Sequence, residues 1–314
     1  MDSLVYSLNA TLPIFAVIFL SYVLKRRGFF SEGFIAGADK VIFKLFLPIL
    51  LFRDIAAGRI TETFDLKFFL FCAISTTVYF FAIWAGAELF LRDKSMIGAF
   101  TQGAFRGSLA VLGVAFIQNI YGDAGLAPLM IVATVPLYNI YAVLVLTVRS
   151  NSRQPGRSLL RSTLVGILTN PIILGILCGL PFSLLEVDFP AVVTKTLDMF
   201  AAPATPLALV SIGAGFEGAK AIQKLGPTIA ASLIKLVVLP GIFLPIAYAM
   251  GFRDQALVAL LIMTGAPSTV TCYIMTKNMD GDAVLSSSII VLTTALSALT
   301  MTAALYIMHS IGAI

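Results

Sequence analysis

The sequence predicts an all-α integral membrane protein, and three observations lead to this fold class. Hydrophobic residues fill 59% of the 314 positions and charged residues only 12%, a far more apolar balance than a soluble domain has. The apolar runs have about 20 residues each, which is the length of a helix that crosses a bilayer. They lack the alternating segments of about 10 residues that a membrane β-barrel contains. The expected surroundings of the chain are therefore a lipid bilayer.

Ten apolar runs give ten expected membrane-spanning helices. They cover residues 4–24, 32–57, 66–90, 95–119, 123–148, 159–180, 190–216, 226–250, 255–277 and 282–307. The first run differs from a signal peptide because its basic cluster, Lys25 to Arg27, follows the apolar residues instead of preceding them. We therefore expect the first helix to be retained.

Basic residues divide the loops into two unequal sides. The loops of one side contain Lys25, Arg26, Arg27, Arg92, Lys94, Arg149, Arg153, Arg157, Arg161, Lys220, Lys224 and Lys277, and those of the other contain Arg59, Lys67 and Arg253. Because cytoplasmic loops carry the excess of Lys and Arg, we expect both termini to lie outside a cytoplasmic (inner) membrane. The same bias accounts for most of the net charge of +5, so no nucleic-acid partner is expected.

Two related halves are indicated by a recurring loop pattern. A polar linker, residues 150–158, separates a first repeat, 1–149, from a second, 159–314. The first contains "LRDKSMIGAF" and then "YGDAGLAPLMIV", and the second contains "FRDQALVALL" and then "DGDAVLSSSIIV". Five helices in each half is an odd number of crossings, so the second copy enters the membrane upside down. The chain is therefore expected to form the 5+5 inverted repeat found in many secondary transporters.

Helix-breaking residues occur at corresponding positions of the two halves. "GAPSTVT" interrupts the ninth span and "AFRGSLA" the fourth. Pro267 removes a backbone donor, and Gly107 weakens its helix by about 1 kcal/mol relative to alanine. Irregular backbone at membrane depth is tolerated only where protein or a water-filled cavity satisfies it, and paired breaks point to a transporter's binding site. The alternative for Pro267 is a kink packed against neighbouring helices.

Arg106 is the single most informative residue. It lies 106 − 95 = 11 positions into its expected span, or about 16 Å deep, close to the centre of a hydrocarbon layer about 30 Å thick. A guanidinium there costs at least about 2.5 kcal/mol unless it is paired or hydrated. We expect a carboxylate partner, because the guanidinium fork matches a carboxylate. That partner belongs either to an anionic substrate or to the protein.

Charged residues before the prolines of the second and seventh spans are candidates for ion coupling. Asp39 and Lys44 precede Pro48, and Asp198 precedes Pro203. A carboxylate in a partly dry cavity can carry a proton. The alternative is that these side chains extend to the membrane interface, which long charged side chains near helix ends commonly do.

Other chemistry has little support in the sequence. The three cysteines lack CxxC spacing and the chain has one histidine, His309, so we expect neither a metal site nor a cofactor. No Walker motif for ATP and no assembled nucleophile and base are recognisable. We therefore do not expect an enzyme.

Several of these segments together resemble the auxin efflux carrier family of membrane transporters, in its bacterial branch of malonate or organic-acid permeases. The matching pieces are "LFLPILLF", "FRGSLAVLGVAF" and "GAPSTVTCYIMTKNMDGDA". The resemblance implies ten helices in which the fourth and ninth cross at unwound centres. It also implies a scaffold of helices 1, 2, 6 and 7 that can form a homodimer, and a moving transport unit made of the other six.

The resemblance also implies a function and a site. By motif position, the substrate-binding residues are Arg106, Gly107, Ser108, Pro267, Ser268 and Thr269. Ser108 departs from the family pattern, which often has asparagine there. The expected function is secondary transport of a small organic anion, a carboxylate, by alternating access. The alternative is a proton- or sodium-coupled antiporter that uses intramembrane carboxylates, with Asp39, Lys44 and Asp198 as the coupling candidates.

Overall fold

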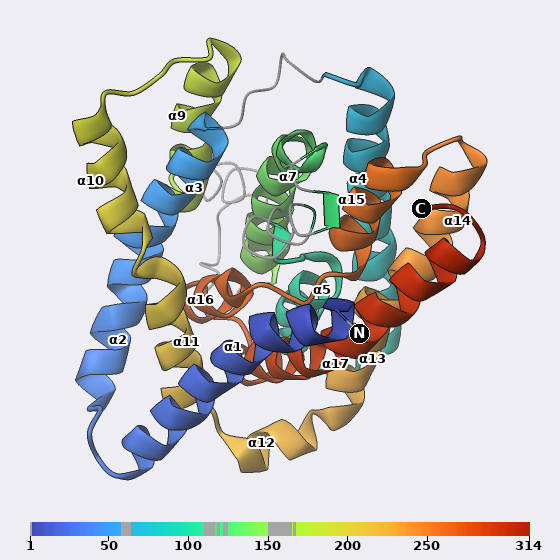
Figure 1. Ribbon diagram of the computed structural model, residues 1–314. Coiled ribbons are helices and arrows are strands. Elements are labelled where there is room, and N and C mark those ends of the chain that lie inside the picture. Colours follow the sequence, from blue (N-terminus) through green and yellow to red (C-terminus); the bar gives the residue numbers. More distant parts are fainter. Residues whose placement is uncertain are drawn as a thin grey trace.

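The computed structural model describes residues 2–57, 64–109, 117, 120–121, 125–149, 165 and 168–314, and every regular element among them is helical (Figure 1). Side chains are described from Pro13 onward, except for that of Ala219. The expected linker 150–158 and most of the second part of the fourth span lie outside the described residues.

The described helices of the first half follow the expected spans closely. They are α1 (Asp2–Arg26), α2 (Glu32–Val41), the π-helical turn η1 (Ile42–Phe46), α3 (Leu47–Ala56), α4 (Leu66–Phe90), the 3-10 turn η2 (Lys94–Met96), α5 (Ile97–Phe105) and α7 (Ala127–Val148). Helix α4 has the expected bounds because Asp65 caps it, its side chain accepting the amide of Phe68 at 3.1 Å.

The second half contains more and shorter helices. They are α9 (Pro171–Leu184), α10 (Ala191–Ala201), α11 (Ala204–Ala214), α12 (Gly218–Gln223), α13 (Leu225–Leu233), the π-helical turn η4 (Ile234–Val238), α14 (Leu239–Ala249), α15 (Asp254–Gly265), α16 (Val270–Asn278) and α17 (Ala283–Ser310). The start of the sixth span, expected over 159–180, lies partly outside the described residues. Helix α9 begins at Pro171, after the Asn170 cap, and continues to Leu184.

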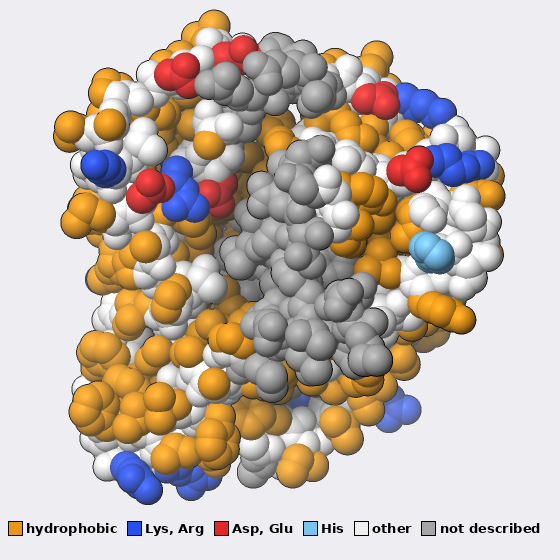
Figure 2. Space-filling model, in the orientation of Figure 1, with side chains coloured by type: hydrophobic (Ala, Val, Ile, Leu, Met, Phe, Trp, Pro, Cys, Tyr) orange, Lys and Arg blue, Asp and Glu red, His pale blue; other side chains and the backbone are white. Residues whose placement is uncertain are grey.

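The helices have the length and composition of membrane spans. Within the described parts of the chain, six helical segments are long and apolar enough to cross a membrane: α4, α7, α17, α10 with α11, α13 with η4 and α14, and α15 with α16. Helix α9 is a shorter apolar helix. On the face seen in Figure 2, charged side chains gather in the upper part and along the lower edge, while a band between them on the left is hydrophobic or uncharged. This distribution fits a multi-pass membrane protein.

The helices pack in two main groups, and their buried apolar residues form two clusters, the second of which also includes residues of α7, α16 and α17. In one group α3 packs on α9 and α1 on α11, and in the other α4 packs on α7 and α14 on α15. Glycines bring the first group into backbone contact. A Cβ added at Gly213 would lie 2.2 Å from the carbonyl oxygen of Ile18, and one at Gly175 would lie 2.4 Å from that of Pro48. Only glycine allows such close approach between these helices.

Replacing Gly213 with alanine should therefore destabilise the folded protein. The added methyl group must push α11 away from α1, and overpacking of this kind costs about 1–3 kcal/mol. The expected result is a lower thermal unfolding temperature in detergent. Gly241→Ala is the matched control, because no atom lies within 4 Å of a Cβ added there. Equal unfolding temperatures for the two variants would contradict the close contact.

Candidate functional site

Two segments expected to break are non-helical at their centres. Helix α15 ends at Gly265 and α16 begins at Val270, and between them Ala266 (φ −63°, ψ 148°) and Thr269 (φ −80°, ψ 145°) are extended. Helix α5 ends at Phe105, and Arg106 is extended as well (φ −83°, ψ 136°). Each change of backbone direction leaves amide and carbonyl groups without helical partners.

The two non-helical segments bond to each other. The Ser108 amide donates to the Pro267 carbonyl oxygen at 3.0 Å, and the Ser268 hydroxyl donates to the Gly103 carbonyl oxygen. The Ser268 amide donates to the Thr293 hydroxyl at 3.1 Å. Backbone groups that lose helical partners in one segment are thus partly satisfied by the other segment and by α17.

A cavity of about 100 Å³ lies against both segments. All six binding residues expected from the sequence line it: Arg106, Gly107, Ser108, Pro267, Ser268 and Thr269. Across the cavity are residues of α1, α3 and α11, namely Ile14, Leu50, Leu51, Asp54, Thr205 and Leu209. The cavity therefore separates the two helix groups, with the non-helical segments on one wall.

Arg106 is only 4% exposed and is held by neutral groups. Its Nη2 donates to Oδ1 of Asn139 at 3.1 Å, and Nη1 lies 3.4 Å from Oε1 of Gln102 and 2.9 Å from the sulfur of Met275. Its Nε has no hydrogen-bond partner among the described residues. In the part of the chain that the structure describes, Arg106 forms no ion pair, so the protein carboxylate considered from the sequence is not found there. Amide oxygens orient the guanidinium without cancelling its charge.

The start of α16 offers further donors to the same cavity. Thr269, Val270 and Thr271 line it, and the side chain of Thr269 accepts the Thr271 amide only at 3.5 Å. The first amides of a helix lack internal partners and carry the positive end of the helix dipole. An anion in this position would be stabilised by both.

Lys235 is a site residue that the sequence reasoning missed. It lies in η4, is fully buried, and its Nζ donates to the carbonyl oxygens of Met263 and Thr264 at 3.1 and 2.9 Å. These carbonyls belong to the last turn of α15, next to the non-helical segment. The signal was present, because a lone lysine near the middle of the apolar run 226–250 is itself a functional indication.

Asp54 is the second missed residue, and it brings a carboxylate to the cavity wall. Its Oδ1 accepts hydrogen bonds from Nε and Nη2 of Arg53, at 3.0 and 2.7 Å. Arg53 also reaches Asp198, with Nη1 3.3 Å from Oδ1. One guanidinium is thus shared by two carboxylates, of which Asp54 lines the cavity and Asp198 does not.

The three coupling candidates all lie away from this cavity. Asp39 is buried, accepts the hydroxyl of Ser211, and pairs with Lys277 at 2.6 Å. The carboxylate of Asp198 is 54% exposed, and Lys44 is exposed. Among the described residues, no group of three or more His, Cys, Asp or Glu side chains could hold a metal ion.

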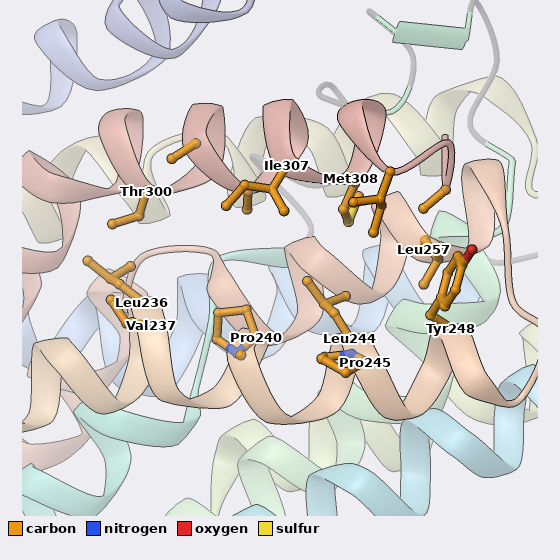
Figure 3. Close-up of a pocket in the computed structure, with 15 residues that line it drawn as sticks. Leu236, Val237, Pro240, Leu244, Pro245, Tyr248, Leu257, Thr300, Ile307 and Met308 are labelled. Atoms are coloured by element: carbon orange, nitrogen blue, oxygen red, sulfur yellow. The ribbon is translucent and has the colours of Figure 1, made fainter.

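A larger cavity, of about 480 Å³, has different chemistry (Figure 3). It lies mainly between α14 and α17, where Leu244 and Pro245 of one helix face Ile307 and Met308 of the other. Thr300 and Tyr248 supply its only side-chain hydroxyls, and it has no charged lining residue. It cannot offer a carboxylate the partners that burial requires, so the smaller polar cavity is the candidate site.

Comparison with known proteins agrees with a membrane transporter. The sequence pattern of the family described as "Membrane transport protein" matches residues 6–305. The chain is 24% identical to a "Putative malonate transporter" of Rhizobium meliloti, with 95% of each chain covered. It is 21% identical to an "Uncharacterized transporter" of Methanothermobacter thermautotrophicus, covering 93% of this chain and 95% of that protein.

The Asp39–Lys277 pair joins α2 to α16, and it should contribute to stability. In a double-mutant cycle, Asp39→Asn and Lys277→Met are expected to show a coupling energy of about 1–3 kcal/mol, because residues in direct contact are not additive. The coupling energy is obtained from the free energies of unfolding of the wild type, the two single variants and the double variant in detergent. Lys25 with Glu32 is the control pair, since it has a similar distance of 2.5 Å but an exposed carboxylate, and no resolvable coupling is expected there. Additive effects of the Asp39 and Lys277 variants would show that the pair is not formed.

Proposed function

The chain belongs to the membrane transport protein family, whose auxin efflux carriers its motifs resemble, and from this premise we propose that it carries a small organic anion across the membrane. It is a transporter and not an enzyme. The proposed substrate class is a carboxylate, and the proposed site is the polar cavity at the two non-helical segments.

One observation carries this proposal: a buried guanidinium with no ion pair among the described residues stands at the cavity wall. A bound carboxylate would provide the negative charge that Asn139 and Gln102 do not. Charge-assisted hydrogen bonds to a guanidinium are about twice as strong as neutral ones. The amides at the start of α16 would share the anion's charge.

The proposed architecture is the ten-helix, 5+5 inverted repeat, with the fourth and ninth spans crossing inside the bilayer. Three findings support it. Helices α5 and α15 end at corresponding motif positions, the Ser108 amide bonds to Pro267, and α1 packs on α11 while α3 packs on α9. The repeats would be residues 1–149 and 159–314, joined by the linker 150–158.

The proposed mechanism is alternating access. The group containing α1, α3, α9 and α11 would be the scaffold and could form a homodimer, while the remaining helices would move against it. Because the cavity lies between the groups, such a movement would open it first to one side and then to the other. We place the protein in the inner membrane with both termini outside, as the distribution of basic loops predicts.

A second candidate is a proton- or sodium-coupled antiporter that uses intramembrane carboxylates. The position of Asp54 in the cavity favours it specifically, whereas Asp39, Lys44 and Asp198 lie elsewhere. Reconstituted protein separates the two functions. Proton or sodium exchange in proteoliposomes without any organic anion would support the antiporter, and uptake that requires a carboxylate would support the anion transporter.

The name of the Rhizobium relative suggests where a substrate search should begin. Malonate is a dicarboxylate, so thermal-shift screening of the purified protein should include malonate, its longer homologues and monocarboxylates of similar size. A rise in the unfolding temperature identifies a ligand, because any molecule that binds the folded state stabilises it.

Arg106→Met should abolish anion binding while the protein still folds. The variant keeps much of the side-chain volume but removes the charge, and truncating one partner of a buried charge pair costs about 2–5 kcal/mol, or about 30-fold or more in affinity. Binding is measured by thermal shift and uptake in proteoliposomes. Arg27→Met, at an exposed loop position, is the control and should bind as the wild type does. Wild-type affinity in Arg106→Met would refute the proposed role.

A further inference from the structure

Lys235 is a second buried cation at the proposed site, and the function described so far does not use it. Its side chain is fully buried in η4, and it forms no ion pair with a described carboxylate. It does not line the cavity itself. A charged group at membrane depth costs at least about 2.5 kcal/mol unless its surroundings compensate for it, so its position calls for a physical reason.

The carbonyl end of α15 provides part of that reason. The helix stops at Gly265, so no amide of a following helical turn donates to the carbonyl oxygens of Met263 and Thr264. They carry the negative end of the helix dipole, which favours a cation. Lys235 donates to both. An ammonium has three N–H donors, and these two bonds use two of them.

A neutral side chain could have capped these carbonyls. The hydroxyl of Tyr138 already donates to the Met263 carbonyl oxygen at 3.2 Å, and the same residue lines the cavity. Capping alone therefore does not explain why this position has a charged residue. The charge itself must be useful at this place.

Gly107 brings the ammonium against the other non-helical segment. A Cβ added at Gly107 would lie 3.2 Å from Nζ of Lys235 and 3.5 Å from the Cβ of Ala266. Gly107 itself lines the cavity, so the ammonium lies close to a residue of the cavity wall. It bonds to the end of α15 and lies beside the segment that follows α5.

We propose that Lys235 is a positioning residue of the anion site, which holds the end of α15 against Gly107 and provides, together with Arg106, a second positive charge for the bound anion. This inference rests on the proposed function. The carboxylate of Asp54 is already bonded to Arg53, so among the described residues neither Arg106 at the cavity wall nor Lys235 close behind Gly107 has a carboxylate dedicated to it. Such a charge balance favours a doubly charged anion over a singly charged one.

The test compares Lys235→Gln with the wild type, using malonate and its monoamide as probes. Glutamine keeps two N–H donors for the carbonyls but has no charge. We expect Lys235→Gln to unfold at the wild-type temperature in detergent, to bind malonate about tenfold more weakly or worse, and to lose clearly less affinity for the monoamide, since Coulomb energy scales with the ligand's charge. Binding is measured by calorimetry on the full-length protein.

Two further variants complete the design. Lys235→Arg retains the charge and should keep the wild-type ratio of malonate to monoamide affinity, so it provides the measurement if Lys235→Gln does not fold. Lys224→Gln, which removes a lysine that pairs with Asp282 away from the cavity, should leave that ratio unchanged.

Three outcomes would overturn the inference. Lys235→Gln could bind malonate with wild-type affinity, it could lose both probes by the same factor, as a purely structural cap would, or Lys235→Arg could fold but lose the wild-type ratio. If the wild-type protein binds no carboxylate at all, the proposed anion transport fails and the role of Lys235 fails with it. If the wild type binds carboxylates and the ratio is insensitive to Lys235, only the inference about Lys235 fails.

Discussion

The hydrogen bond from the Ser108 amide to the Pro267 carbonyl oxygen is the contact on which the site depends. A bilayer offers no water to backbone groups, so two spans can be non-helical at depth only if they satisfy each other or face a polar space. Ser268 adds bonds to Gly103 and to Thr293. These contacts hold two segments, more than 150 positions apart in the sequence, on one wall of a single cavity.

Burial distinguishes the cations of the site from the other cations of the described chain. Away from the cavity, Lys277 and Lys224 pair with carboxylates, and Lys67 and Arg253 donate to backbone carbonyls, but none of these four side chains is buried. At the site, Arg106 is bonded to amide oxygens and Lys235 to backbone carbonyls. Neutral hydrogen-bond acceptors orient a charged side chain but do not neutralise its positive charge. This arrangement supports the proposed binding of an anion.

Much of the fold follows from local sequence, whereas the composition of the site does not. Asp65 and the apolar run after it define α4, and Pro267 by its own chemistry predicts the end of a helix. The lone lysine in an apolar run was a signal for Lys235, but its partners on α15 and the position of Asp54 at the cavity depend on which helices become neighbours. Periodicity within one helix cannot reveal that. For Arg106 the sequence left open a carboxylate of the substrate or one of the protein; among the described residues the protein supplies the amide of Asn139, 33 positions later.

The glycine contacts at Gly175 and Gly213 have a mechanical consequence. At these glycines the backbones of two helices are in contact, and no side chain lies between them that could change rotamer when one helix moves. The pairs α1–α11 and α3–α9 are therefore stiff. The cavity wall opposite the broken segments is built from side chains such as Leu50 and Leu209, which can change rotamer and slide. Structural adjustment is therefore easier along the cavity than within these two helix pairs.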